Sequence, residues 1–275
     1  MKRLEGRVAV VTGASRGGGK GIALVLGEEG ATVYVTGRSV GGEGTTLDRP
    51  GTIDGTAEEV TARGGVGIPA RCDHTVDAEV EALFARVGRE QDRLDILVNN
   101  AWGGYELSPD PDLPFWEIEL RHWDLMFTAG VRAQMTAGRF AVPLLLRTPG
   151  SLIVNTTWVL DRPHGHAFYE VAKTASHRLT ASMAADLREH GVAVIGLSPG
   201  WMRLDRMNLP PERAAMTESP EFVGRAAAAL AADPNVLGKS GQVLTVVALA
   251  REYGFTDIDA SVTSPFWIEH YAASS

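Results

Sequence analysis

The chain's 275 residues, 44% of them hydrophobic, are enough for one well-packed core and favour a single domain over residues 1–275. The formal net charge of −8, without a basic run, makes nucleic acid and anionic membranes poor candidates as partners. The single cysteine, Cys72, has no partner for an internal disulfide, and no apolar run resembles a secretion signal or a membrane span, so we expect a cytoplasmic protein.

Short β-branched runs alternate along the chain with longer amphipathic segments. The expected strands are residues 8–12, 32–36, 66–70, 94–99, 151–156, 192–198 and 242–247. Helical patterns lie between them, notably over residues 77–91 and 172–190. Apolar strands that alternate with helices predict a doubly wound, Rossmann-type α/β domain: a seven-stranded parallel sheet with helices on both faces. Its ligands should bind beyond the carboxyl ends of the strands.

The first expected strand runs into a glycine-rich turn, "TGASRGGGKG", at residues 12–21. A mononucleotide P-loop is excluded, because Ala14 and Gly21 stand where that loop needs a glycine and a hydroxyl. The spacing instead has the form T-G-x-x-x-G-x-G, made by Thr12, Gly13, Gly17 and Gly19. Glycines here let backbone N–H groups approach a pyrophosphate at a helix N-terminus, which predicts a dinucleotide site.

The second expected strand ends without the acidic residue that often holds the ribose diol of NAD. Gly37 stands at that position, Arg38 follows, and Arg16 lies inside the glycine turn. Guanidinium groups bind phosphate in a bidentate manner, so this pattern favours NADP, with NAD less favoured. Two loops, residues 39–55 and 102–114, leave carboxyl ends of strands and are expected to border the site.

Four motifs occur in order, each at the end of an expected strand or on the helix that follows it. They are the glycine turn, "LVNNA" at 97–101, "YEVAK" at 169–173 and "SPGWMR" at 198–203. Together they resemble the short-chain dehydrogenase/reductase family over nearly the whole chain, and residues 240–260 resemble one branch of it. The resemblance implies an oxidoreductase that moves hydride between a nicotinamide and a small or medium apolar carbonyl or alcohol, and a homo-oligomer built through long helices.

The resemblance makes Tyr169 the acid/base and Lys173 its electrostatic partner, one helical turn away. A phenol is a weak base at neutral pH, but a nearby ammonium favours its ionised form, so the pair can exchange a proton with substrate. The resemblance also implies a cofactor-binding set that includes Asp73 at the adenine. The expected set is Gly13, Ser15, Arg16, Gly17, Gly19, Arg38, Asp73, Asn100, Ala101, Lys173, Pro199, Gly200 and Met202. This chemistry needs no metal.

Three positions depart from the family pattern. Where a catalytic serine is usual, direct register places Trp158, a one-residue shift places Thr157 as the hydroxyl donor, and Thr156 is a further alternative. The helix asparagine that anchors a proton-relay water is Gly130, and a usual threonine is Leu204. A non-catalytic or weakly active dinucleotide-binding scaffold therefore remains the alternative hypothesis.

The rim of the expected site is aromatic and irregular. Trp102, Trp158 and Trp201 each follow a strand end, which suggests an aromatic substrate pocket. His164 and His166 lie near Tyr169, either as loop residues or in contact with substrate. The lid and C-terminal regions are expected near 201–222 and 255–275, where the aromatic segment 264–271 should dock on the body or on a neighbouring subunit.

Overall fold

A computed structural model describes residues 2–43, 45–104, 106, 113–159, 163, 165–204, 207 and 209–262. Seven strands form one parallel sheet in the order β3-β2-β1-β4-β5-β6-β7. They are β1 (Val8–Val11), β2 (Thr32–Gly37), β3 (Val66–Arg71), β4 (Ile96–Asn99), β5 (Leu152–Thr156), β6 (Ala193–Ser198) and β7 (Val243–Thr245). This confirms the predicted doubly wound fold. The order reverses between β1 and β4, which is where such sheets bind ligands.

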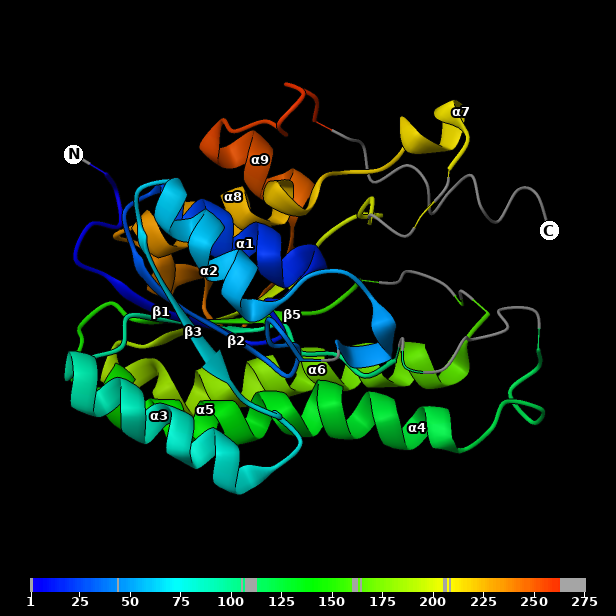
Figure 1. The fold of residues 1–275 in the computed structure, drawn as a ribbon, viewed down its shortest axis with the longest axis horizontal. Helices are drawn as coiled ribbons and strands as arrows, with labels where there is room; N and C mark the ends of the chain where they lie inside the picture. The colour runs from blue at the N-terminus through cyan, green and yellow to red at the C-terminus, as the bar shows by residue number, and fades with distance from the viewer. Residues whose placement is uncertain are drawn as a thin grey trace.

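Helices cover both faces of the sheet (Figure 1). On one face lie α1 (Gly17–Glu28), α2 (Ile53–Ala62), α8 (Pro220–Ala232) and α9 (Val246–Tyr253). On the other lie α3 (Asp77–Gln91), α5 (Ala133–Leu145) and α6 (Ala167–Leu187). The remaining elements are α4 (Arg121–Met126), η2 (Phe127–Arg132), α7 (Pro211–Ala214) and the short 3₁₀ turns η1 (Thr46–Asp48), η3 (Arg188–His190) and η4 (Val236–Lys239).

Two apolar cores follow from the alternation of side chains along the strands. Ala9 and Val11 of β1 face the core beneath α1, α2, α8 and α9. Val8 and Val10 face the core beneath α3, α5 and α6. Successive strand residues point to opposite faces, so a strand that is covered on both sides is apolar throughout. The sheet is thus a rigid platform that holds its carboxyl-end loops in place.

Some element boundaries differ from the sequence prediction. The expected strand 242–247 ends at Thr245, because the Thr245 hydroxyl accepts the N–H of Ala248 at 3.3 Å and starts α9. Helix α6 begins at Ala167, five residues before the expected 172, because the ring of His166 accepts the N–H of Tyr169 at 3.2 Å. The predicted loop 39–55 contains η1 and the first turn of α2.

The helix between β4 and β5 contains a turn of π-helix. Helix α4 passes through η2 into α5 without a break, and η2 holds Gly130. Single π turns inside long helices occur frequently at functional sites. This one faces the groove described below.

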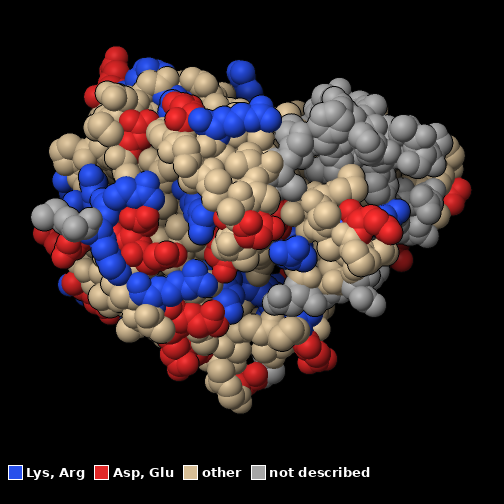
Figure 2. Space-filling model, turned by 90° about the horizontal axis from the view of Figure 1, so that it is seen from above, with Lys and Arg blue, Asp and Glu red and all other residues tan. Residues whose placement is uncertain are grey.

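The outer part of the expected lid carries α7, and α8 begins inside it at Pro220. His164 and the segment 264–271 lie outside the described residues. Within the described ranges, no helix is both long and apolar enough to cross a bilayer. Basic and acidic side chains are intermixed on the face seen in Figure 2.

Candidate active site

A groove of about 770 Å³ runs along the carboxyl ends of the central strands. The sequence-predicted residues in its wall are Gly13, Ser15, Arg16, Gly17, Arg38, Asp73, Asn100, Ala101, Thr157, Tyr169, Lys173, Pro199, Gly200 and Met202. Gly19 is not in the wall, whereas Gly18 is. A Cβ at Gly19 would lie 2.3 Å from the Gly13 carbonyl oxygen and 2.4 Å from the Asn100 amide nitrogen, so Gly19 serves close packing beneath the turn.

The glycine turn adopts backbone conformations that favour glycine and is braced against β4. Gly13 and Gly17 have φ of +64° and +57°, which favour glycine, and the first turn of α1 contains no acidic residue. The Thr12 hydroxyl accepts the N–H groups of Asn100 and Ala101 at 2.8 and 2.9 Å, which ties β4 to β1. The Asn100 amide donates to the carbonyls of Thr12 and Gly13, both at 3.1 Å. The turn is braced, and the positive end of α1 opens onto the groove.

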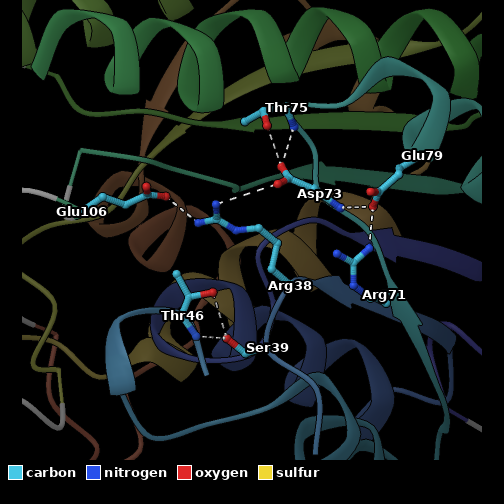
Figure 3. A network of polar contacts seen from close by, with 8 residues as sticks. All are labelled: Arg38, Ser39, Thr46, Arg71, Asp73, Thr75, Glu79 and Glu106. Carbon is cyan, nitrogen blue, oxygen red and sulfur yellow. Dashed lines mark hydrogen bonds and ion pairs between the residues drawn. The ribbon is translucent and has the colours of Figure 1, made fainter. Parts of the chain in front are cut away.

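One end of the groove, which we call the arginine end, consists of Arg16, Arg38, Asp73 and Glu106. Arg38 pairs with Glu106 and lies 3.9 Å from Asp73 (Figure 3). Thr75 donates to Asp73 Oδ1 from its backbone N–H at 2.9 Å and from its hydroxyl at 2.7 Å. Burial works to raise the pKa of Asp73, but these hydrogen bonds and Arg38 outweigh it and hold the pKa below its usual value.

Arg16, in the glycine turn, hydrogen-bonds to the loop that follows β2. Its guanidinium donates to the Ser39 hydroxyl at 2.8 Å and to the backbone carbonyls of Thr46, Arg49, Pro50 and Gly51. Burial, together with the charges of Arg49 and Arg38, lowers the pKa of Arg16. Ser39 also accepts the N–H of Thr46 at 3.1 Å (Figure 3). Arg16 thus holds this loop beside Arg38, and the hydroxyls of Ser39 and Thr46 lie next to it.

The other end, which we call the aromatic end, consists of Trp102, Trp158, Tyr169 and Lys173. The Tyr169 ring lies 5.6 Å from both Trp102 and Trp158, with edge-to-face geometry in each case. Lys173 Nζ lies 3.7 Å from the ring centre of Trp102 and 5.4 Å from that of Tyr169. Burial lowers the pKa of the Lys173 ammonium to about 7. The structure therefore brings together the tyrosine and lysine that the sequence pairs, and encloses them in aromatic rings.

The two threonines near the expected serine position use their hydroxyl hydrogens on backbone. Thr157 Oγ1 donates to the Lys173 carbonyl at 3.0 Å, and Thr156 Oγ1 donates to the Asn99 carbonyl at 3.1 Å. A threonine hydroxyl has one hydrogen to donate, so a donor role of Thr157 toward substrate requires the bond to Lys173 to break. In the conformation seen, Thr157 ties the end of β5 to the turn of α6 that carries Lys173.

Three residues that support the site have no sequence motif. Glu218 accepts the N–H of Gly200 at 2.9 Å, and burial raises the pKa of its carboxyl to about 8. Gln134 accepts from Ser176 at 2.6 Å and donates to the Thr156 carbonyl at 3.3 Å, which braces β5 against α6. Glu106 pairs with Arg38 at the arginine end. Each depends on contacts between distant segments, so no local pattern could reveal it.

A parallel sheet with a glycine turn at its switch point and a Tyr–Lys pair at its carboxyl edge defines a class: oxidoreductases that use a nicotinamide dinucleotide. The pattern of the short chain dehydrogenase family matches residues 7–211. The chain belongs to the short-chain dehydrogenase/reductase family.

Relatives and a solved structure agree with this assignment. The chain is 38% identical to mouse (Mus musculus) "Dehydrogenase/reductase SDR family member 1", covering 98% of this chain and 89% of that protein. The human (Homo sapiens) protein of the same name is 36% identical, covering 93% and 84%. The crystal structure of hydroxysteroid dehydrogenase from Escherichia coli superposes with a TM-score of 0.73 at 27% identity, covering 89% and 96%. The predicted resemblance to one branch of the family is confirmed by the first two.

Proposed function

We propose that this protein is an NADP(H)-dependent carbonyl reductase or alcohol dehydrogenase, with Tyr169 as its acid/base. The observation that carries this proposal is the juxtaposition of Tyr169 and Lys173 on α6, in the wall of the same groove that the glycine turn lines. When bound, the nicotinamide supplies or accepts the hydride. The proton must then be handled by the chain's own side chains.

In the reducing direction, the Tyr169 phenol donates its proton to the substrate oxygen as that oxygen gains charge. The Lys173 ammonium stabilises the phenolate that remains, because a positive charge close by favours the ionised form. In oxidation the same phenolate accepts the proton of the alcohol. We also assign Lys173 to the ribose of the nicotinamide half, and the bond from Thr157 to the Lys173 carbonyl supports the turn that carries it.

The choice of NADP is supported by the arginine end. Gly37 places no carboxylate at the end of β2, and Arg38 follows with the hydroxyls of Ser39 and Thr46 nearby. A 2′-phosphate would take Arg38 as a bidentate partner and the Thr46 hydroxyl as a donor, and Ser39 would become a donor only if its bond to Thr46 is released. Arg16 contributes through the loop that it holds, and its positive charge adds to the local field. The direct pairing of Arg38 with Glu106 must loosen for this to occur.

The substrate proposed is an apolar carbonyl compound or alcohol of small or medium size. Trp102 and Trp158 line the aromatic end of the groove, and Trp201 and Met207 also line the groove. Apolar surface of this kind binds apolar substrates through burial from water. The Escherichia coli relative named as a hydroxysteroid dehydrogenase acts, by that name, on a largely apolar alcohol, which supports the same class here.

The test is a panel of apolar ketones and aldehydes assayed with NADPH, with the wild type compared to Tyr169→Phe. We expect turnover by the wild type and its loss in the variant, with cofactor binding retained. A wild type that binds NADPH but turns over none of the panel would favour the non-catalytic scaffold instead.

We also propose that the protein is a homo-oligomer through the helices around α4 and α5. Three large apolar side chains are partly open to solvent there: Trp123 on α4 (38% exposed), Met135 on α5 (48%) and Val171 on α6 (47%). Light scattering coupled to size exclusion tests this, and a monomer at micromolar concentration would contradict it.

A further inference from the structure

The indole of Trp102 occupies a slot between glycines. A Cβ at Gly130 would lie 2.5 Å from Trp102 Cζ3 and 2.6 Å from Cε3, and a Cβ at Gly104 would lie 2.5 Å from Nε1. Real side-chain atoms do not approach so closely, so any other residue at either position displaces the ring. Gly130 belongs to the π turn η2, which places its backbone against the ring. Trp102 and Gly130, the glycine that departs from the family pattern, are therefore two halves of one contact.

The ring that fills this slot lies over the Lys173 ammonium. The distance from Nζ to the ring centre is 3.7 Å, well inside the range in which a cation is attracted to an aromatic face. Within the part of the chain that the structure describes, no carboxylate or hydrogen-bond acceptor is recorded for Nζ. The indole face is thus the contact that most directly compensates the burial of this charge.

We propose that Trp102 is a positioning residue for Lys173: its indole, seated against Gly130, holds the ammonium beside Tyr169 in the space where an asparagine side chain and its water would otherwise stand. This inference rests on the proposed function only in giving Lys173 a task toward Tyr169. The contact between the indole and the ammonium does not depend on any reaction.

Contact with a ring face and exclusion of water have opposite effects on the pKa of a lysine. The ring favours the charged form of Lys173, whereas simple exclusion of water disfavours it. If the ring face matters, replacing it with an aliphatic side chain of similar reach lowers the pKa of Lys173. If the indole only keeps water out, the same replacement leaves the pKa unchanged or lets it rise toward the usual lysine value.

The test is an NMR titration of protein labelled with ¹³C at lysine Cε. The chain has four lysines, Lys2, Lys20, Lys173 and Lys239, so few signals need assignment, and Lys173→Arg identifies the one of interest. In the wild type we expect that signal to titrate near pH 7. In Trp102→Leu its midpoint should fall by about one pH unit, and in Trp102→Phe, which keeps a smaller ring, by less. A midpoint that stays or rises in Trp102→Leu would overturn the proposal.

A second variant moves the ring without changing it. Gly130→Ala forces the indole away from its slot, so the Lys173 midpoint should shift in the same direction as in Trp102→Leu. Gly138→Ala is the matched control, because it adds the same methyl group to α5, 2.5 Å from the flexible Met183 methyl end and outside the groove wall. Its Lys173 midpoint should equal that of the wild type. Equal Lys173 midpoints in Gly130→Ala and Gly138→Ala would contradict the claim that Gly130 seats the Trp102 indole against Lys173.

The outcomes separate this proposal from the proposed function. If no carbonyl compound is turned over but the Trp102 variants lower the Lys173 midpoint, the positioning role holds and the enzyme assignment fails. If Tyr169→Phe abolishes turnover while the Trp102 variants leave the midpoint in place, the enzyme assignment holds and the positioning role fails. In an active enzyme, the alkaline limb of the kcat/KM profile should move with the midpoint.

Discussion

The two ends of the groove hold positive charge by opposite means. At the arginine end, Arg38 meets the carboxylates of Glu106 and Asp73, and the three side chains are 37%, 23% and 22% exposed. At the aromatic end, Lys173 is desolvated and lies against the Trp102 ring. Exposed ion pairs are weak and exchange partners readily, whereas a desolvated charge in a fixed ring contact is already arranged before ligand arrives. The first end suits recognition of an anion, and the second suits a reaction.

Removal of the Tyr169 hydroxyl, at the aromatic end, should have the largest effect, a loss of catalytic activity. We expect Tyr169→Phe to lower kcat/KM for carbonyl reduction by about 10²–10⁴-fold, the usual contribution of a positioned acid/base. NADPH affinity, measured by fluorescence titration, should stay within a factor of two, roughly the scatter of such comparisons. Tyr253→Phe, which removes a phenol on α9 outside the groove wall, serves as the control and should retain activity. Comparable turnover in wild type and Tyr169→Phe would remove Tyr169 from the mechanism.

Removal of Arg38 should abolish the selectivity of the arginine end. Arg38→Ala is expected to weaken NADPH binding by about 10–100-fold, since a hydrogen bond to a charged group contributes about 1.5–3 kcal/mol. NADH, which lacks the 2′-phosphate, should lose little affinity. Arg71→Ala is the matched control, because Arg71 pairs with Glu79 nearby but outside the groove wall. The proposal that Arg38 selects NADPH fails if the wild type binds NADPH and NADH equally well.

Glu218 offers a test of the support for Gly200 in the groove wall. Burial raises the pKa of its carboxyl to about 8 in the folded chain, above the ordinary value of 4.5. The folded state therefore binds more protons than the unfolded state between these values, and the stability that this group contributes is lost as pH rises toward 8. Glu218→Gln should remove that dependence. Between pH 6 and 8, the free energy of unfolding of the variant minus that of the wild type should therefore increase with pH, by at most about 1.4 kcal/mol per pH unit.

Urea unfolding at several pH values measures this difference. The control is Glu212→Gln, an exposed change on α7 in the same part of the chain, which should follow the wild type. If the free energy of unfolding changes with pH by the same amount in Glu218→Gln and in the wild type, the carboxyl is already ionised in the folded protein at pH 6.

Weakening the ion pair between Arg38 and Glu106 should have the smallest effect, a modest gain in NADPH affinity. Glu106→Gln weakens the ion pair that competes with a 2′-phosphate, so NADPH should bind about two- to five-fold more tightly, in keeping with about 0.5–1 kcal/mol for a part-exposed pair. The gain should shrink in high salt, which screens exposed charges. Glu81→Gln, an exposed change on α3, should have no effect. Unchanged or weaker binding by Glu106→Gln would mean that Glu106 does not compete for Arg38.

Much of the groove could be predicted from local pattern. The alternation of apolar strands and helices predicted the sheet, and helix 77–91 has the predicted bounds. The motifs predicted that Gly13, Asn100 and Pro199 follow strand ends and that Tyr169 lies on the helix after the fifth strand, so that all four meet at one edge of the parallel sheet. Helix α6 was predicted to begin too late, since its first turn depends on the His166 ring rather than on apolar spacing.

The sequence by itself determined the class of fold, the glycine turn and the spacing of Tyr169 and Lys173, since these depend on neighbours within one strand–turn–helix unit. Only the tertiary structure decided which partners the charged groups meet. It paired Arg38 with Glu106, engaged the Thr157 hydroxyl with the Lys173 carbonyl, and set Trp102 against Gly130 over Lys173. These contacts join residues from 16 to more than 60 positions apart in the sequence, and packing, which depends on distance in space, cannot be seen in a pattern along the chain.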